Sequence, residues 1–395
     1  MRILHIDETF HPSFGYQCNP LAKFQQREGN EVFIIAPEAP YIYKVYHSFG
    51  EYGENLDKED AYYTKDTGVQ IIRVPAKGWI MERLNYDMPK LYDAIKQVKP
   101  DSIMVHCAET LTAIRVLRHL NREYPMIIDS HMLSMASQNK LSWLFDFAYR
   151  LLCTSIIKRQ GIRIIKTQND DYVTTHLGVP DYLTRFISFG TDTVLFHPNE
   201  DAKNVFLAEK GLPKESFVIV STGKLNAQKN GKLFASAVKD KFANRRVVVI
   251  VVANFVSEYE MQVKHELENG SNEVFFFPVQ RYLDLPWFYQ IADVTVFPKQ
   301  CSMSFYDAQS CASPVISEKG HVNEERNSHG NGLCFECGSV DDLRCKIQTL
   351  IDMQPNEYKK MRQNSLKYSS CFSYDIIASE YTEELEEARR KFKNQ

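Results

Sequence analysis

Two lysines five positions apart are the most informative residues for chemistry. Lys224 and Lys229 follow an apolar run, in a polar segment that begins at Gly223 and precedes a predicted helix. Both ammonium groups could point at one diphosphate, and each charged hydrogen bond contributes about 1.5–3 kcal/mol. A solvated loop explains the same residues equally well. The segment is therefore a candidate diphosphate site, with a surface turn as the alternative.

A second candidate lies after a predicted strand that ends at Pro298. Ser302 and Ser304 place hydroxyl groups at the start of the next predicted helix, and Asp307 follows one turn later. A helix N-terminus favours an anion, because its N–H groups lack helical partners and its dipole is positive there. The carboxylate of Asp307 can accept hydrogen bonds from both hydroxyls of a ribose. A helix cap with an acid in its first turn is the structural alternative.

The first half of the chain offers two further candidates, each at the end of a predicted strand. Gly15 lies in a loop that enters a helix, where a glycine lets the backbone approach a phosphate. His131 follows a predicted strand and could orient, or accept a proton from, a reacting sugar or phosphate. A plain turn and a structural histidine are the respective alternatives.

Short apolar runs alternate with helical stretches through most of the chain and must position these residues. The runs are continuously hydrophobic, which is typical of parallel strands buried on both faces. Two such series predict two doubly wound α/β domains joined near residue 190, with ligands at the carboxyl ends of the strands and in the cleft between domains. The expected strands are 2–7, 31–37, 69–75, 102–107, 126–129, 163–167 and 185–188, then 217–223, 246–252, 274–278, 294–298, 314–318 and 332–336.

Composition narrows the possible functions. The 395 residues carry a net charge of −3, so there is no basic surplus to neutralise the phosphates of a nucleic acid. Only 17 glycines accompany 24 Phe and 21 Tyr, which disfavours a glycine-rich phosphate loop. We find no apolar run long enough to span a bilayer, no signal-peptide core and no zinc-site spacing beyond a lone C-x-x-C. We therefore expect a cytoplasmic protein.

Three segments could contact a second substrate. Residues 38–67 are rich in Tyr and acids without clear periodicity, and we expect a long loop there. Residues 77–81 and 141–159 combine aromatic and aliphatic side chains with Lys and Arg. They could form an apolar surface with basic edges that touches a membrane, although a core helix with charged ends explains 141–159 as well.

Four stretches resemble motifs of retaining glycosyltransferases with the GT-B fold, specifically of the large family 4. In that family the corresponding motifs read P-N-G-V-D-x-x-x-F-x-P, V-G-R-L-x-x-x-K-G, L-x-x-x-Y-x-x-A-D-V-x-V-x-P-S and L-x-E-A-M-A-C-G-x-P-V-I. The stretches are residues 187–198 (ISFGTDTVLFHP), 220–230 (VSTGKLNAQKN), 285–298 (LPWFYQIADVTVFP) and 304–316 (SFYDAQSCASPVI). They occur in the family's order, and the resemblance covers nearly the whole chain.

The resemblance implies two Rossmann-like domains that face each other across a cleft. Residues 1–188 would form the acceptor-side domain, joined by a returning helix at 373–395, and residues 189–372 would bind the nucleotide sugar. Lys224 and Lys229 would hold the donor diphosphate and stabilise it as a leaving group. The remaining donor-binding positions that it implies are Gly15, Tyr16, Gly223, Ser302, Met303, Ser304 and Asp307, and His131 would be catalytic and face the donor sugar.

Two departures from the family pattern concern the donor. The first Glu of the family's paired-Glu motif falls on Lys299, so the donor sugar is in question, and Lys224 replaces an Arg and loses its bidentate fork. The resemblance implies transfer with retention at the anomeric carbon, without a required metal or other cofactor. Its commonest donors are UDP-sugars, and we expect one here, such as a UDP-N-acetylhexosamine.

These features predict a glycosyltransferase that modifies a glycan or lipid-linked saccharide acceptor in bacterial surface polysaccharide or lipopolysaccharide synthesis. Its partners would be the nucleotide sugar, the acceptor and the inner face of the cell membrane, and not nucleic acid. Two alternatives share the fold: a nucleotide-sugar 2-epimerase and a non-catalytic sugar-nucleotide-binding subunit, which the missing Glu would suit. Product analysis without an acceptor separates the first, and binding without turnover would identify the second.

Overall fold

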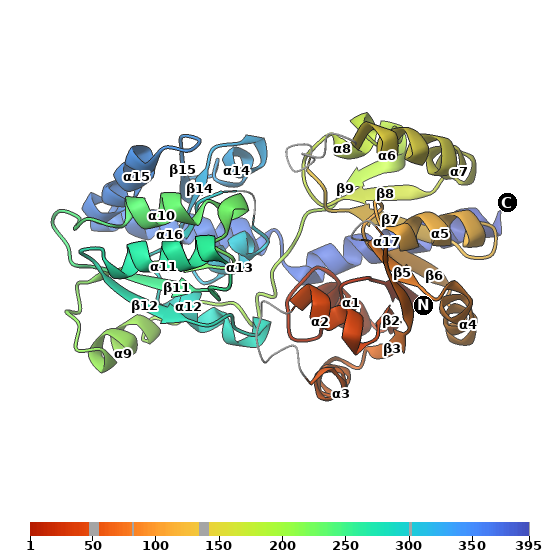
Figure 1. The fold of residues 1–395 in the computed structure, drawn as a ribbon, viewed down its shortest axis with the longest axis horizontal. Coiled ribbons are helices and arrows are strands. Elements are labelled where there is room, and N and C mark those ends of the chain that lie inside the picture. The colour runs from red at the N-terminus through yellow and green to blue at the C-terminus, as the bar shows by residue number, and fades with distance from the viewer. Residues whose placement is uncertain (47–54, 81–82, 134–141, 300–301, 395) are drawn as a thin grey trace. The chain divides into compact units, whose positions relative to one another are not determined.

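The computed structural model describes residues 1–46, 55–80, 83–133, 142–299 and 302–394. These residues form two compact units, and each unit is built on one parallel sheet (Figure 1). The first unit runs to Phe189 and resumes at Tyr374, whereas the second contains Gly190–Ser373. The expected class of fold, two α/β halves with parallel sheets, is confirmed.

A seven-stranded parallel sheet forms the centre of the first unit. Its strand order is β3-β2-β1-β6-β7-β8-β9, so β1, β6 and β7 are neighbours although long crossovers separate them in sequence. All seven strands expected in the first series are present. Their bounds are β1 (Arg2–Ile6), β2 (Glu31–Pro37), β3 (Gln70–Val74), β6 (Ser102–Val105), β7 (Met126–Ser130), β8 (Arg163–Lys166) and β9 (Thr184–Phe186).

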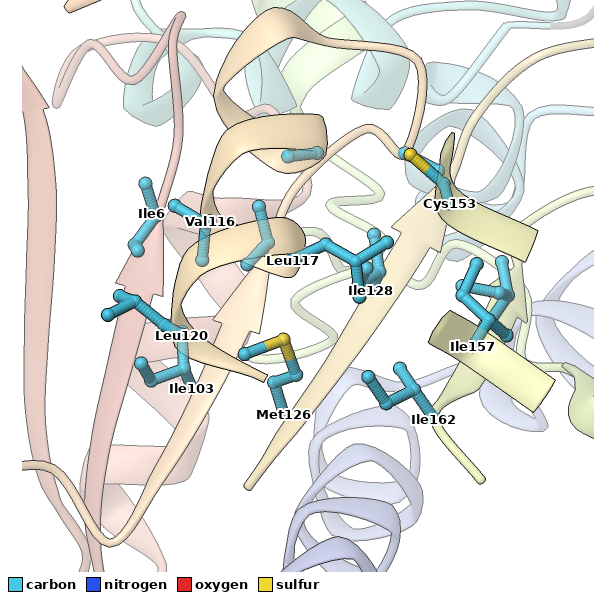
Figure 2. Packing of buried hydrophobic residues seen from close by; sticks show 14 of the residues in the cluster. Ile6, Ile103, Val116, Leu117, Leu120, Met126, Ile128, Cys153, Ile157 and Ile162 are labelled. Atoms are coloured by element: carbon cyan, nitrogen blue, oxygen red, sulfur yellow. The ribbon is translucent and has the colours of Figure 1, made fainter. Parts of the chain in front are cut away.

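Successive residues of these strands point to opposite faces of the sheet, and both faces are buried. Figure 2 shows the core on one face, where Ile6, Ile103 and Ile128 pack against Val116 and Leu117. Each such side chain stabilises the fold by about 1.5–3 kcal/mol on burial. The helices of the unit are α1 (Cys18–Arg27), α2 (Ala39–Tyr46), α3 (Leu56–Thr67), α4 (Met88–Val98), α5 (Leu111–Leu120), α6 (Ser142–Tyr149), the π-helical η3 (Arg150–Thr154), α7 (Ser155–Gln160), α8 (Tyr172–Thr175) and the C-terminal α17 (Tyr374–Lys393), with a short 3₁₀ turn η4 (Asp181–Leu183).

The C-terminal helix α17 packs on the opposite face of the same sheet. Tyr381 and Leu385 are buried in one cluster with Ile3 and Phe24, and the hydroxyl of Tyr381 accepts a 2.9 Å hydrogen bond from Nε2 of Gln17. Glu384 carries charge pairs across this interface, including a 2.6 Å contact with Arg185. The last helix therefore belongs to the first unit, although the whole second unit precedes it in the sequence (Figure 1).

The second unit has a six-stranded parallel sheet with the order β12-β11-β10-β13-β14-β15. All six strands expected in the second series are present, with bounds β10 (Phe217–Thr222), β11 (Val247–Val252), β12 (Glu273–Phe277), β13 (Val294–Phe297), β14 (Val315–Glu318) and β15 (Gly332–Phe335). The helices are α9 (Ala202–Glu209), α10 (Gly231–Ala237), α11 (Glu258–Glu268), α12 (Pro286–Gln290), α13 (Ser304–Ser310), α14 (His321–Arg326), α15 (Val340–Asp352) and α16 (Pro355–Ser370), with 3₁₀ turns η5 (Ala227–Lys229) and η6 (Tyr282–Asp284).

Two parts of the first unit differ from the sequence-based expectation. The loop expected over residues 38–67 is wrong for the described residues, because α2 and α3 occupy most of this segment. An antiparallel hairpin of β4 (Ala76–Ile80) and β5 (Arg83–Tyr86) was not expected. The helix α3 was not expected because it buries only Leu56 and Tyr63, and so sparse an apolar pattern does not reveal a helix.

Candidate functional site

The two lysines lie on a tightly constrained turn after β10. Gly223 takes a φ of 100°, in the region that favours glycine, and the side chain of Asn226 accepts a 3.0 Å hydrogen bond from the backbone N of Lys229. Gly231 approaches the backbone so closely that a Cβ there would lie 2.2 Å from the carbonyl oxygen of Leu225. Local backbone chemistry therefore fixes where this turn presents its cations.

Lys224 is exposed, and its charge acts on a carboxylate at the start of α11. Burial tends to raise the pKa of Glu260, but hydrogen bonds from Ser257 and Val256 and the charge of Lys224 outweigh it, so that the pKa falls below its ordinary value. Glu260 also completes a capping box with Ser257. The turn thus places positive charge near Glu260, whose carboxylate already caps α11.

Tyr289 of α12 connects this turn to the start of α13. Its hydroxyl lies 2.8 Å from Oγ1 of Thr222, the last residue of β10, and it also shares a hydrogen bond with the side chain of Ser304. Tyr289 is fully buried, which raises its pKa above the range of ordinary tyrosines. Two of the segments predicted to bind the donor therefore meet at one edge of the second sheet.

Asp307 is buried in the first turn of α13. Its Oδ1 accepts a 2.8 Å hydrogen bond from Oγ1 of Thr191. Burial, with the charge of Asp192, raises the pKa of Asp307 to about 7, although hydrogen bonds from Thr191 and Tyr282 oppose the rise. Asp307 is thus poised to bind a hydroxyl either as a carboxylate or as a carboxylic acid.

Arg326 is a residue of this site that sequence reasoning missed. Although it is only 3% exposed, its Nη1 donates a 2.9 Å hydrogen bond to the carbonyl oxygen of Ser302, and its guanidinium lies over the rings of Phe305 and Tyr306 at 5.4 and 4.9 Å. It therefore anchors the segment of Ser302, Met303 and Ser304, which are half-buried. Arg326 is the last residue of α14 and lies outside the motifs that the sequence analysis used.

The remaining predicted residues, Gly15, Tyr16 and His131, belong to the first unit. Gly15 has an ordinary backbone conformation and lies three residues before α1, and Tyr16 is partly exposed. Burial and the charge of Asp7 raise the pKa of Tyr16, and Asp7 acts in the same direction on His131. Tyr16 and His131 therefore lie near the same carboxylate, at the carboxyl edge of the first sheet.

This edge of the first unit is acidic. Besides Asp7, it carries Glu109, whose pKa burial raises to about 7 and whose side chain accepts a hydrogen bond from the hydroxyl of Ser130. Glu8 accepts a 3.1 Å hydrogen bond from the backbone N of Thr112 at the start of α5. The cations predicted to hold a diphosphate are all in the second unit.

His131 is half-exposed at the end of β7. Its Nε2 lies 3.1 Å from Oδ1 of Asp129, and its ring packs 5.2 Å from the ring of Phe189. The side chain of His131 is 24% exposed, whereas Asp129 is completely buried. Burial tends to lower the pKa of His131, but Asp129, Glu109 and Asp7 raise it above its ordinary value.

Two groups of potential metal-ligating atoms occur among the described residues, and both lie in the first unit. The first group consists of His5, Cys18 and His106, and the second of His106, Asp129 and His131. In each group the potential ligand atoms lie within 4.8 Å of one another. Their histidine and aspartate atoms already pair with one another, so we assign no metal to either group.

A surface cavity of about 770 Å³ in the second unit lies away from all predicted residues. It is found at the amino ends of β11 and β12, opposite to the strand ends that carry the lysine turn. Its lining residues are Lys241, Phe242, Asn244, Arg245, Arg246, Val247, Ser271, Asn272 and Glu273.

The whole chain has the fold of GT-B glycosyltransferases. Sucrose-phosphate synthase from Thermosynechococcus elongatus superposes with a TM-score of 0.71 at 14% identity, covering 97% of each chain. HepE from Anabaena, solved in complex with UDP and glucose, superposes with a TM-score of 0.73 at 16% identity, covering 98% of this chain and 100% of that chain. WaaG, a glycosyltransferase involved in lipopolysaccharide biosynthesis, gives 0.65 at 11% identity, covering 97% and 99%.

Sequence comparison identifies the family of the second unit. Residues 203–368 match the family described as Glycosyl transferases group 1, so this unit carries a group 1 glycosyltransferase domain. The match includes the lysine turn, Tyr289, Asp307 and Arg326. No curated protein sequence matches the chain.

Proposed function

We propose that the protein is a retaining glycosyltransferase of family 4 that uses a UDP-sugar, such as a UDP-N-acetylhexosamine. The observation that carries this proposal is the contact of Tyr289 with Thr222 and Ser304, which brings the lysine turn and the start of α13 to one edge of the second sheet. A nucleoside diphosphate spanning these segments would meet cations at one end and Asp307 at the other. The complex of HepE with UDP-glucose supports the choice of base.

In this proposal the second unit binds the donor and the first unit contributes His131. Lys224 and Lys229 neutralise the departing diphosphate, which is the charge that develops as the glycosidic bond to phosphate breaks. Asp307 holds the ribose, and Gly223, Ser302, Met303 and Ser304 line the diphosphate. Gly15, Tyr16 and His131 approach the sugar. The lysines supply the charge that a metal would otherwise bring, so turnover needs no metal.

Binding of nucleotides tests the donor site directly. A ligand at 100 times its Kd stabilises the folded state by about 2.7 kcal/mol, so thermal shifts with UDP, GDP and ADP rank the bases. We expect UDP to give the largest shift. Equal thermal shifts from all three nucleotides would refute the preference for uridine. Turnover that persists with EDTA present would support transfer without a metal.

The products distinguish transfer from the two other reactions considered for this fold. Incubation with a UDP-sugar and saccharide acceptors should yield UDP and a glycoside with the anomeric configuration of the donor. A change of the donor sugar without an acceptor would instead identify an epimerase. Binding without turnover across donors and acceptors would identify a non-catalytic subunit, for which Lys299 at the position of the family's Glu is the motivating feature.

We further propose that the acceptor is lipid-linked and that the first unit reaches it on the inner face of the cell membrane. Trp143, Phe147 and Leu151 follow at spacings of four residues along α6 and η3 and are 61%, 65% and 66% exposed. The same helical stretch buries Tyr149, Cys153 and Ile157 in the core, so its exposed apolar side chains form the opposite face. Lys158 and Arg159 lie exposed further along, on α7, which suits anionic lipid headgroups.

Vesicle binding tests the membrane contact. No helix of the described residues is long and apolar enough to cross a membrane. Met81 and Leu141, at the ends of the two predicted acceptor segments, lie outside the described residues. We expect the full chain to float with anionic vesicles, and W143S/F147S to float less while keeping UDP affinity. Equal flotation of both proteins would refute the contact.

A further inference from the structure

Three histidines and one aspartate form a row across neighbouring strands of the first sheet. Nδ1 of His5 in β1 lies 3.0 Å from Nε2 of His106, which follows β6. Nδ1 of His106 lies 2.8 Å from Oδ2 of Asp129 in β7, and the other oxygen of Asp129 lies 3.1 Å from Nε2 of His131. Beyond His5, the row reaches Gln25 at 2.7 Å. Of its titratable members, only His131 is appreciably exposed.

The carboxylate of Asp129 is fixed within this row. Besides His106 and His131, the backbone N of Cys107 donates a 2.7 Å hydrogen bond to Oδ1 of Asp129. Cys107 reaches this position with a φ of 62°, a left-handed conformation that is uncommon for a residue other than glycine. Such strain persists where the surrounding structure determines the conformation, and it is frequent at functional sites.

We propose that Asp129 is a positioning residue that holds His131 as an imidazolium, so that His131 acts as a charged hydrogen-bond donor and not as a proton acceptor. Nε2 lies 3.1 Å from Asp129, so a proton on Nε2 is favoured by that carboxylate, and the charge state then decides what Nδ1 can do. A neutral ring would present a lone pair at Nδ1, whereas the imidazolium presents a second N–H. The catalytic meaning of this donor rests on the proposed function, but its charge does not.

Three acidic groups from neighbouring strands favour the charged ring of His131. Asp129 from β7, Glu109 after β6 and Asp7 after β1 each raise the pKa of His131 against the opposing effect of burial. Asp129 remains ionised, because its interactions with His131 and His106 hold its pKa well below the ordinary range despite burial.

His106 contacts the other oxygen of Asp129 through Nδ1. A proton on Nδ1 donates one hydrogen bond to Oδ2 in either charge state of the ring. Behind it, burial lowers the pKa of His5 to about 3, so His5 is neutral at physiological pH. His131 is the exposed end of the row, where an imidazolium would offer a negatively charged ligand a charge-assisted hydrogen bond.

Histidine NMR of the full chain tests the charge without any assay of activity. The H131Q variant identifies the His131 signal by its loss. We expect its pKa to lie above 6.5 in the wild type and to be lower by about 1 or more in D129N, which keeps the shape but removes the charge. A wild-type pKa at or below 6.5, or an unchanged pKa in folded D129N, would overturn the proposal.

The H106N variant is the matched control, because an asparagine amide can replace the Nδ1 donor without titrating. The pKa of His131 should stay within about 0.3 of the wild-type value. A marked rise would mean that His106 carried the charge opposite Asp129, which contradicts the proposal. If D129N does not fold, the wild-type titration and H106N still decide.

The pH dependence of transfer then tests the role of the donor. We expect kcat/KM to fall about tenfold per pH unit above the pKa of His131 and this limb to move to lower pH in D129N. H131Q, which donates a hydrogen bond but does not titrate, should lack the limb. An acidic limb that disappears in H131Q would show a general base and overturn the proposal. If no transfer occurs while the NMR result holds, the proposed function alone fails.

Discussion

Oγ1 of Thr191 donates a 2.8 Å hydrogen bond to Oδ1 of Asp307, and both residues are buried. The bond joins the start of the second unit to the first turn of α13, and it lies beside Asp192. Because burial raises the pKa of Asp307 to about 7, the folded protein holds a proton here at pH values where the unfolded chain has lost it. Thr191 opposes this rise by stabilising the carboxylate.

D307N should therefore change how stability depends on pH. The proton on Asp307 stabilises the folded state fully below the ordinary pKa of 3.8, and this contribution is lost as pH rises through about 7. Since the amide does not titrate, the stability of D307N relative to wild type should increase by about 2–3 kcal/mol between pH 5 and pH 8. Urea unfolding of both proteins at pH 5 and pH 8 measures this difference in the free energy of unfolding. T191V, which removes the bond that lowers the pKa, should steepen the loss, and a relative stability that is flat with pH contradicts the assignment.

K224A and K229A should each reduce donor turnover by about 10²–10³-fold, because removing one preorganised stabiliser of developing charge typically costs this much. Both residues sit on the turn fixed by Gly223 and Asn226. K232A is the control, since the ammonium of Lys232 donates to Gln262 instead. Steady-state release of UDP gives the rates. A loss below about threefold in both variants, or an equal loss in K232A, would contradict the role of the lysines.

Many of the strands were predictable because they contain short, continuous apolar runs. Residues 247–252, for example, are all Val or Ile, and β11 occupies them. The sparse pattern of α3 hid a helix that other signals mark, namely Asp57 and Glu59 in its first turn and Gly68 after its end, at a φ of 82°. The hairpin β4–β5 was missed because Lys77, Gly78 and a bulge interrupt its alternation.

The candidate site was only partly predictable, for a topological reason. Lys224 and Lys229 could be found because both lie on one short turn. The contact of His106 with Asp129 arises only because β6 and β7 are adjacent in the sheet, which spacing along the chain does not reveal. Arg326 reaches Ser302 from a different helix in the same way.

R326A should weaken nucleotide binding through the segment before α13. The loss of a charged hydrogen bond to the carbonyl oxygen of Ser302, and of the stacking on Phe305 and Tyr306, should lower the free energy of unfolding by about 2–3 kcal/mol. The Kd for UDP should rise about tenfold or more, as calorimetry would measure. R326K keeps the charge but not the planar group, so it should recover only part of the affinity. Full affinity in folded R326A would show that this anchor does not shape the site.

G231A should disturb the lysine turn from within. A Cβ at this position would lie 2.2 Å from the carbonyl oxygen of Leu225, and backbone cannot yield as a flexible side chain can. We expect a loss of about 1–3 kcal/mol in the free energy of unfolding, as for other overpacked sites, together with weaker binding of UDP. G320A is the matched control, because a Cβ there would meet nothing within 4 Å. Thermal unfolding of both variants with and without UDP separates the loss of stability from the loss of binding. A displaced turn should reduce both the stability of the free protein and the additional stabilisation by UDP. If G231A and G320A behave alike, the close approach of Gly231 does not hold the turn in place.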